Sequence, residues 1–425
     1  MLIRQKRTAG GQPYIGVLDI GTSKVCSIVA AAEPQARGQA PGYRILGIGH
    51  QRSRGIKAGV IVDLDEAEQA VRAAVSQSER MAGVQIDEVL LAVCCGRLLS
   101  RHFTANAVIE GGVVTDRDVG RAEAAGRAWA EKDGGVLVHM GRLGFRLDGQ
   151  GQIQEPRGLS GRQLSLQLHA VTADDAPLRN LVLLVERCHL AVGGLVPAGL
   201  ASGLAVTTEE ERRLGTMVVE MGAGLTSFAA FADGRLVHID SVPIGGNHVT
   251  YDIARELVTT VQEAERIKTL YGTLVKAASN DGEVFAYPVV GDDEGAMHQA
   301  SKALIREVVK PRIDGLVDLI AERMAEAGLE KLAVRRVVLT GGASQLIGLD
   351  QAWSARLGCL TRIGRPQPIG RMPTSMCSAA FATVIGLVYV GAEPKAEVSM
   401  GGGSEIGRRE RGYIDRMQRW IRESF

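Results

Sequence analysis

The chain has 425 residues and a mass of 45.2 kDa. A chain of this length is too long to fold around a single hydrophobic core, so we expect two or more packed subdomains. A composition of 45% hydrophobic and 23% charged residues, with a formal net charge of +1, excludes a disordered chain and gives no electrostatic reason to expect nucleic-acid binding. Glycine, with 53 residues, is enriched, which favours tight turns and close backbone approach to a bound group such as phosphate.

The cysteine and histidine patterns predict neither disulfides nor a protein-bound metal centre. Six scattered cysteines include no CxxC pair, which favours a reduced, cytosolic setting. The eight histidines show no HxxxH or HxH spacing. The basic N-terminus is followed by no apolar h-region, and no run of about 18 apolar residues occurs, so neither secretion nor a membrane-spanning helix is expected.

The predicted elements of the first half begin with a β-hairpin over residues 14–32, two apolar runs joined by the turn DIGTSK. Apolar residues at helical spacing predict a helix over 65–81, and a strand is expected over 88–95. A capped, alanine-rich stretch predicts a helix over 115–132.

The second half repeats the opening pattern at residues 216–231, where apolar runs flank the turn MGAGLT. Two similar hairpins about half a chain apart indicate two related lobes. A helix is predicted over 252–271, and residues 335–349 predict a buried strand that enters a Gly-Gly turn.

The composition changes after Val390. Residues 391–410 contain Pro, Ser and a triple glycine, which predicts a flexible linker, and helical periodicity resumes over 411–425.

Both predicted hairpins carry residues suited to phosphate. Glycines let the backbone approach the anion, hydroxyls and N–H groups bind its oxygens, a lysine adds charge, and an acid can hold Mg²⁺ through water. The first hairpin alone could also be an ordinary strand turn with a surface lysine, and the glycine turn of the second hairpin is a weak signal by itself. No GxxxxGK[ST] or GxGxxG motif is present. The first set is Asp19, Gly21, Thr22, Ser23 and Lys24, and the second is Glu220, Gly222, Ala223, Gly224, Thr226 and Ser227.

A third glycine motif is Gly341-Gly342-Ala343, which lets backbone lie flat against an adenine or ribose, or forms a plain left-handed turn. In this order the three motifs resemble those of the actin-like ATPase superfamily. The resemblance implies an α/β fold of two lobes with ATP between them, and Asp19 positioning Mg²⁺ through water. It also makes Glu265 and Lys268, in the pattern AERIK, contacts to the adenosine; both could instead form an ion pair on a solvated helix face.

Within this superfamily the chain resembles the FtsA family of bacterial cell-division proteins. The resemblance rests on PAGLASGLAV before the second hairpin, VPIGGNHVTYDIA after it, EVVKPR at 307–312, and the tail. It implies an inserted small α+β subdomain that contacts later division proteins and neighbouring protomers. It also implies that Lys310 and Arg312 bind the C-terminal peptide of the tubulin-like FtsZ; otherwise they belong to a solvated basic helix end.

The resemblance implies the following division of the chain. The expected units are a first lobe (1–84, completed by 166–205 and 375–390), an inserted 1C-type subdomain (85–165), a second-lobe core (206–242 and 312–374), a IIB subdomain (243–311), the linker (391–410) and a membrane-targeting helix (411–425).

One residue departs from the family pattern, because Glu220 stands where an aspartate is usual. The side chain is one methylene longer, and octahedral Mg²⁺ with an aligned water tolerates displacement poorly. We therefore assign Asp19 and Glu220 as the candidate catalytic acids but expect at most slow ATP hydrolysis.

The last segment predicts an amphipathic surface-binding helix. Six arginines against three acids between Arg408 and Phe425 give it a net side-chain charge of +3, which suits anionic lipid. Such a short helix is marginal in water, so folding should be coupled to lipid binding and polymerisation should strengthen attachment through avidity. Docking on the protein body is the alternative. The apolar face comprises Ile414, Met417, Trp420, Ile421 and Phe425, flanked by Arg416, Arg419 and Arg422.

The resulting hypothesis is an ATP-binding, filament-forming peripheral protein at the division site, on the cytoplasmic face of the inner membrane, that tethers FtsZ filaments during septum formation. Two alternatives share the nucleotide motifs: a sugar-kinase-like phosphotransferase, and an actin-like assembly protein of a pilus or secretion system. The linker and tail argue against both.

Overall fold

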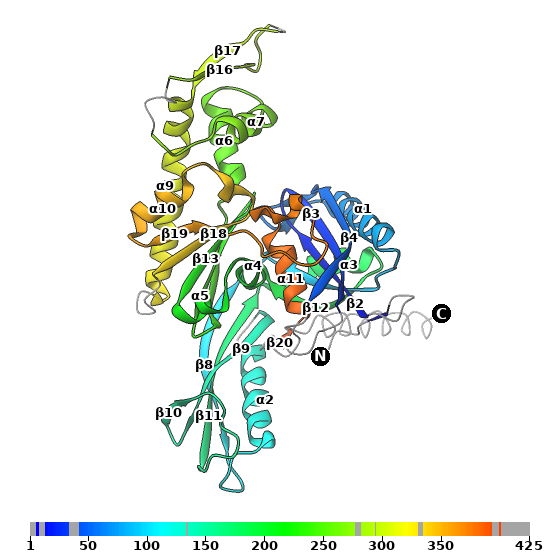
Figure 1. Ribbon diagram of the computed structural model, residues 1–425, viewed down its shortest axis with the longest axis vertical. Coiled ribbons are helices and arrows are strands. Elements are labelled where there is room, and N and C mark those ends of the chain that lie inside the picture. Colours follow the sequence, from blue (N-terminus) through cyan, green and yellow to red (C-terminus); the bar gives the residue numbers. More distant parts are fainter. Residues whose placement is uncertain are drawn as a thin grey trace, which may run out of the picture.

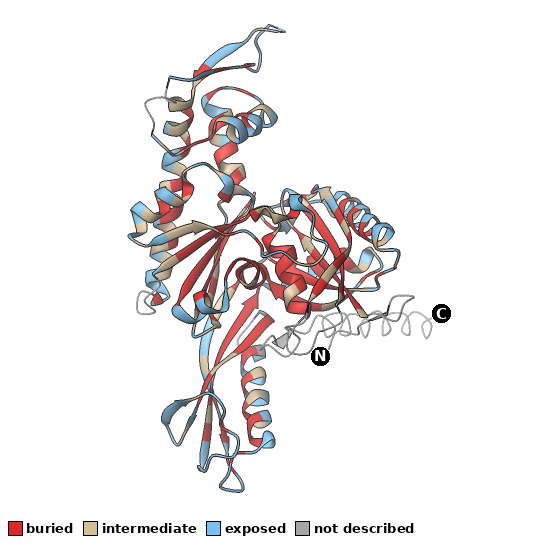
Figure 2. Cartoon of the chain, viewed as in Figure 1, coloured by how far each residue is buried: buried red, intermediate tan, exposed pale blue. Residues whose placement is uncertain are grey.

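The computed structural model describes residues 6–7, 13–33, 42–132, 135–276, 282–293, 295–329, 335–392 and 399–400. The molecule is elongated, with a first lobe on the right of Figure 1, a second lobe on the left, and a smaller unit projecting at each end of the long axis. The strands of both lobes are mostly buried, whereas the ends of the two projecting units are largely exposed (Figure 2).

The first lobe contains a mixed sheet in the order β12-β7-β2-β3-β4, with β1 (Lys6–Arg7) paired to β2. The hairpin β2–β3 and its neighbour β4 are antiparallel, whereas β7 and β12 run parallel to β2. The strands are β2 (Pro13–Ile20), β3 (Lys24–Ala32), β4 (Tyr43–Arg52), β7 (Glu88–Val93) and β12 (Ala191–Pro197).

Helix α1 (Leu64–Ala82) shows why the sequence folds this way locally. Asp63 caps its N-terminus by accepting from two backbone N–H groups, and Gly83 ends it in the left-handed conformation. Its buried residues recur at helical spacing and pack on β4, where Gly47 and Gly49 have no room for a Cβ against the helix backbone. Helices α3 (Asp175–Arg187) and α11 (Ala382–Ala392) complete the lobe.

The second lobe contains a sheet in the order β15-β14-β13-β18-β19, in which β13–β14 is the second predicted hairpin. The antiparallel part of the sheet is β13–β14–β15, and β18 and β19 run parallel to β13. The strands are β13 (Thr216–Met221), β14 (Thr226–Ala232), β15 (Arg235–Val242), β18 (Arg336–Thr340) and β19 (Leu360–Ile363), and the helices are α4 (Ala198–Val206), α5 (Glu209–Leu214), η2 (Gly342–Gln345), α10 (Leu349–Leu357), η3 (Thr374–Cys377) and η4 (Ala379–Phe381).

Two helices join the lobes, because α4 packs against strands of both sheets and against α11. The crossing is close: a Cβ on Gly386 would lie 1.8 Å from the carbonyl oxygen of Ala201. Only glycine fits there, so the sequence of α11 fixes how near the two helices approach.

The upper unit of Figure 1 is built from α6 (Gly246–Glu256), α7 (Val261–Tyr271), the upper part of α9 (Lys302–Glu326), and the hairpin β16 (Val284–Tyr287) with β17 (His298–Ser301). The sequence predicts one helix over 252–271, but two helices meet here. The chain breaks at Val258, which has a positive φ of 49°, and restarts where Thr260 caps α7 by accepting from the Glu263 N–H.

The lower unit is a sheet in the order β10-β9-β11-β8 with α2 (Asp116–Lys132) and its own apolar core. Its strands are β8 (Leu99–Val108), β9 (Val136–Leu147), β10 (Gln150–Ile153) and β11 (Gln163–Ala173), and the edge of β9 also pairs with β20 (Ser399–Met400). The expected limits of 85–165 differ from this sheet at both ends. β7 is a buried strand of the first-lobe sheet, whereas β11 extends to Ala173.

Candidate nucleotide site between the two glycine hairpins

Both predicted phosphate hairpins close with the same backbone hydrogen bond. The Gly21 N–H donates to the carbonyl of Lys24 at 2.9 Å, and the Gly222 N–H donates to the carbonyl of Leu225 at 2.9 Å. Each turn therefore presents a short stretch of backbone at the end of a buried strand pair. The two lobes therefore carry equivalent hairpin turns, as the internal similarity of the sequence predicts, and phosphate binding by them stays a prediction.

Two carboxyl groups lie at the base of these hairpins. Burial raises the pKa of Asp19 to about 6, while nearby Lys24 opposes the shift and Glu220 adds to it. Burial also raises the pKa of Glu220, and hydrogen bonds from Thr383 and the charge of Lys24 oppose that shift. Two half-buried acids and one lysine from both lobes thus share one site, an arrangement that suits a cation or a phosphate bound beside it.

Glu220 is held by hydroxyl groups. Its carboxylate accepts from Ser227 at 3.3 Å, and its other oxygen contacts the hydroxyl of Thr383 on α11. Because the glutamate is one methylene longer than aspartate, it reaches from β13 to a helix of the first lobe. The side chain therefore links the lobes.

Lys24 points toward the segment before α11. Its ammonium donates to the carbonyl of Ala380 and lies 4.8 Å from the centre of the Phe381 ring. Both contacts come from η4, so the lysine is held at the edge of the site by neighbours that the sequence did not indicate.

The Gly-Gly motif lies against the second hairpin. Gly341 has a φ of 87°, and a Cβ there would lie 2.5 Å from the carbonyl oxygen of Met221. Gly342 begins η2, and the Cβ of Ala343 lies 3.0 Å from the position a Cβ would take on Gly246 of α6. The close approach demands glycine at position 341.

Glu265 and Lys268 form one cluster beside this motif. The Lys268 ammonium donates to the Glu265 carboxylate at 2.6 Å, to the Thr250 hydroxyl at 2.8 Å and to the carbonyl of Gly246 at 3.2 Å. The two residues thus form the ion pair that the sequence left open, beside the Gly-Gly turn, and their contact with adenosine stays a prediction.

The remaining hairpin residues differ in exposure. Thr22 and Ala223 are partly exposed and Ser23 is exposed, whereas Gly224 is buried against the first lobe. Thr226 is fully buried and its hydroxyl donates to the carbonyl of Ile244 at 2.7 Å. Its hydroxyl is therefore committed to holding the hairpin against the chain that enters α6.

These residues fit a nucleotide with Mg²⁺. The hairpin glycines are tightly packed, since an added Cβ would lie 3.2 Å from a carbonyl oxygen at Gly21, 3.0 Å at Gly222 and 2.7 Å from the Thr22 hydroxyl at Gly224. Asp19, Glu220 and Lys24 interact electrostatically at the base of these hairpins. Asp19 would position the metal, the two hairpins with Lys24 would hold the phosphates, and the group around Gly341 and Lys268 would face the adenosine. The bound metal would neutralise phosphate charge.

Sequence reasoning missed three neighbours of this site. They are Thr383, Phe381 and the turn at Ala58–Gly59, which contacts both hairpins. Thr383 lies 163 residues from Glu220 along the chain, and no local pattern marks it. The turn does have a signal, because Gly59 belongs to the glycine-flanked segment GIKAG between the first hairpin and α1.

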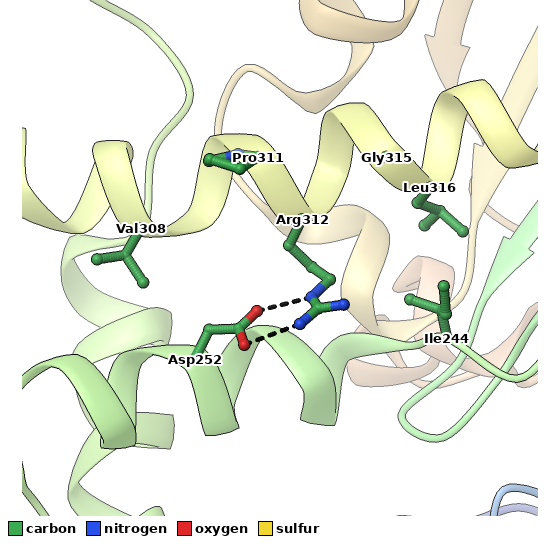
Figure 3. Close-up of a pocket in the computed structure, with 7 residues that line it drawn as sticks. All are labelled: Ile244, Asp252, Val308, Pro311, Arg312, Gly315 and Leu316. Atoms are coloured by element: carbon green, nitrogen blue, oxygen red, sulfur yellow. Dashed lines mark hydrogen bonds and ion pairs between the residues drawn. The ribbon is translucent and has the colours of Figure 1, made fainter.

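Lys310 and Arg312 lie elsewhere, on α9, and a pocket of about 410 Å³ lies between α6 and α9 (Figure 3). Arg312 lines this pocket and binds Asp252 through Nε at 2.7 Å and Nη2 at 2.9 Å. Lys310 is exposed and contacts Asp314 one turn further on. The rest of the lining is largely apolar: Ile244, Val308, Pro311, Gly315 and Leu316.

The predicted membrane-binding residues, from Ile414 to Phe425, lie outside the described residues. Within the part of the chain that the structure describes, no helix has the length and apolarity needed to span a bilayer. The described part of the chain also contains no group of three or more His, Cys, Asp or Glu side chains that could hold a metal ion.

Comparison with known proteins places these features in a family. Residues 217–386 match the family described as Cell division protein FtsA, and residues 96–172 match the SHS2 domain inserted in FTSA. Cell division protein FtsA of Rhizobium meliloti is 38% identical over 420 residues, covering 97% of this chain and 95% of the relative. The Escherichia coli K12 protein of the same name is 31% identical, covering 96% and 97%.

A solved structure supports the fold independently. The chain from the PilM-PilN type IV pilus biogenesis complex aligns with a TM-score of 0.62 at 17% identity, covering 89% of this chain and 99% of that one. The two lobes, the paired hairpins and the inserted SHS2 domain define a protein with the actin-like ATPase fold, as predicted. More narrowly, the chain belongs to the FtsA family of cell division proteins, which confirms the resemblance seen in the sequence.

Proposed function

We propose that this chain binds ATP with Mg²⁺, polymerises on the cytoplasmic face of the inner membrane, and tethers FtsZ filaments there during septum formation. The observation that carries the proposal is the meeting of two phosphate-type hairpins from opposite lobes around Asp19, Lys24 and Glu220. Membership in the FtsA family favours this function over a sugar kinase or a pilus assembly protein.

Slow hydrolysis is part of the proposal. A residue that aligns an attacking water must be free to approach it, whereas Glu220 already accepts from Ser227 and contacts Thr383. Bound nucleotide then acts mainly by holding the two lobes in one arrangement. This shift in population requires that nucleotide bind that arrangement more tightly than the other, and it does not require ATP hydrolysis.

The pocket between α6 and α9 suits an extended peptide with apolar and acidic side chains. The pair with Asp252 uses Nε and Nη2 of Arg312, so it fixes the guanidinium plane and leaves Nη1 out of the pair. A peptide carboxylate can bind this third nitrogen while apolar residues enter the pocket beside Val308 and Leu316. This is the surface we propose for the FtsZ C-terminal peptide.

A peptide titration tests this surface. Arg312→Glu places an acid beside Asp252 and should reduce affinity for an acidic FtsZ C-terminal peptide at least tenfold. Arg356→Glu is the matched control, because Arg356 also pairs with an aspartate, Asp318, but does not line this pocket. Equal affinity of both variants and the unaltered protein would overturn the assignment.

The tether is tested by electron microscopy of the protein with ATP and Mg²⁺ on an anionic lipid monolayer. A chain that ends at Glu410 lacks the amphipathic segment. Filaments on lipid with the full chain and none with the shortened chain are expected. If neither chain forms filaments or binds the monolayer, the tether is refuted, and phosphotransfer to candidate acceptors becomes the next assay.

A further inference from the structure

A tight turn of the first lobe stands between the two phosphate hairpins. It joins β5 (Ile56–Lys57) to β6 (Val60–Ile61), and its central residues have positive φ angles, 47° at Ala58 and 76° at Gly59. Left-handed backbone is unfavourable for alanine, so the surrounding contacts must hold the turn in place. Those contacts come from both lobes.

The first contact is to Thr22 in the turn of the first hairpin. The Gly59 N–H donates to the Thr22 hydroxyl oxygen at 3.1 Å. A hydroxyl has one hydrogen and two acceptor lone pairs, so accepting from Gly59 leaves the hydrogen available for a second partner. An anion bound at the hairpin is a partner of the right kind, since it can only accept.

The second contact is to Gly224 in the turn of the second hairpin. A Cβ on Gly224 would lie 2.7 Å from the Thr22 hydroxyl oxygen and 2.8 Å from the Cα of Ala58. A Cβ on Gly59 would lie 2.9 Å from the side chain of Leu225. Three segments from two lobes therefore meet without space for one added methyl group.

The turn is also connected to the body of the first lobe. The Val62 N–H donates to the carbonyl of Gly55 at 2.8 Å, and Asp63 then caps α1, whose inner face packs on β4. The route from the turn to α1 is short and hydrogen-bonded, so the turn is a fixed part of the lobe.

We propose that the Ala58–Gly59 turn is a third element of the nucleotide site, which positions the Thr22 hydroxyl to donate to the phosphates and does so only while Gly224 of the opposite lobe is packed against it. This rests on the proposed nucleotide binding. Gly59 and Ala58 are positioning residues, and the phosphate contact itself belongs to Thr22. Nucleotide affinity then depends on lobe closure, because closure packs Gly224 against the Thr22 hydroxyl and Ala58.

The test is a double-mutant cycle read as the Kd for Mg-ATP by calorimetry. Thr22→Val removes the hydroxyl and should weaken binding about tenfold, and Gly59→Ala, which strains the turn against Leu225, should do the same. Because Gly59 acts through Thr22, the double variant should be no weaker than either single one. Thr22→Ser should retain affinity close to that of the unaltered protein.

Gly83→Ala is the matched control, because Gly83 has a similar φ of 67° but no neighbour within 4 Å of its added Cβ. It should leave the Kd unchanged. Gly224→Ala disturbs the same contact from the other lobe and should also weaken binding. It replaces Gly59→Ala in the test if that variant does not fold.

The outcomes separate this inference from the proposed function. If the unaltered protein does not bind Mg-ATP, the proposed function fails. If it binds, but the Thr22 and Gly59 effects multiply or Gly59→Ala binds normally, only the role of the turn is overturned. Hydrogen exchange of the nucleotide-free protein adds a second measurement: Gly224→Ala should reduce protection at residues 55–63, and unchanged protection there would contradict the contact.

Discussion

Asp19 and Glu220 determine the charge of the candidate site. Both are acids whose pKa is raised by burial, so their ionised forms are unfavourable in the folded protein, and a cation bound beside them would reduce that cost. Active sites commonly combine such local instability with function. Stability and binding should therefore respond in opposite directions when this charge is removed.

Asp19→Asn tests this opposition. The folded pKa of about 6 lies above the unfolded value near 3.8, so ionised Asp19 lowers stability increasingly as pH rises from about 4 to 6 and by a constant amount above that. The variant should be more stable than the unaltered protein at pH 7, by up to about 3 kcal/mol, and should lose this pH dependence. Thermal melting without nucleotide or Mg²⁺ measures both.

Mg-ATP titration of the same variant, and of Asp19→Ala, should show binding and filament formation lost together. Retention of both would remove Asp19 from the site, whereas a less stable variant would show that the residue is structural.

Thr383 provides a second residue-level test, because it satisfies one oxygen of half-buried Glu220. Thr383→Val keeps the shape but removes the hydroxyl, and it should lower stability by about 1 to 3 kcal/mol because a half-buried carboxylate loses a partner. Thr383→Ser keeps the hydroxyl and serves as the control. Chemical denaturation of the pair decides the point, and equal stability of the two variants would contradict the link.

At the scale of elements, the periodicity of apolar residues predicted the helices and hairpins whose formation depends on residues close together in the sequence. The hairpins β2–β3 and β13–β14 and the helix α1 follow from apolar spacing with turn or cap residues at their ends. The break between α6 and α7 was missed because the apolar pattern continues across it, and only Val258 with its positive φ marks the turn. β7 was assigned to the insertion because parallel pairing with β2 and β12 is not visible locally.

The junction between the insertion and the second lobe contains a histidine cluster that no sequence pattern predicts. His169 contacts Ser100 at 2.9 Å, and Ser100 in turn bonds the backbone of Ile239 on β15. The rings of His102 and His139 lie 5.1 and 6.4 Å from that of His169. The strand β15 adds His238, beside the charged residues Asp240 and Arg323, which pair at 3.4 Å.

Acid should open this junction. Burial lowers the pKa of His139 to about 4 and that of His169 well below its usual value, so the unfolded chain takes up protons at these sites before the folded one. The neutral histidines contribute their full stabilisation above about pH 6.5. As the pH drops toward 4, the free energy of unfolding falls, by about 3 kcal/mol for His139. Hydrogen exchange at pH 7 and pH 5 should show protection lost in β8, β11 and β15 before the first-lobe sheet.

His139→Leu should reduce that pH dependence, because the side chain is buried and its Nδ1 has no hydrogen-bond partner among the described residues. If the variant and the unaltered protein lose protection in parallel between pH 7 and pH 5, the cluster does not control the junction.

At the scale of the whole molecule, the resemblance to a family supplied the two-lobed fold, and glycine positions explain how close its parts can come. The sequence showed many glycines but not which of them face backbone from another element. Gly386 is the clearest case, since it brings α11 against α4 where the lobes join. Glu220 and Thr383 lie beside the same crossing, so the candidate nucleotide site is directly connected to the helices that join the lobes.

Gly386→Ala tests this connection. The added Cβ would lie 1.8 Å from the carbonyl oxygen of Ala201, so the helices must separate, and we expect a loss of about 1 to 3 kcal/mol in stability. The lobes should also close less on adding Mg-ATP, which small-angle scattering measures as a smaller change in radius of gyration. Gly120→Ala, in α2, has no neighbour within 4 Å and should instead gain up to about 1 kcal/mol from helix propensity. A Gly386 variant as stable and as responsive to nucleotide as the Gly120 variant would show that the lobes do not depend on the tight α4–α11 contact.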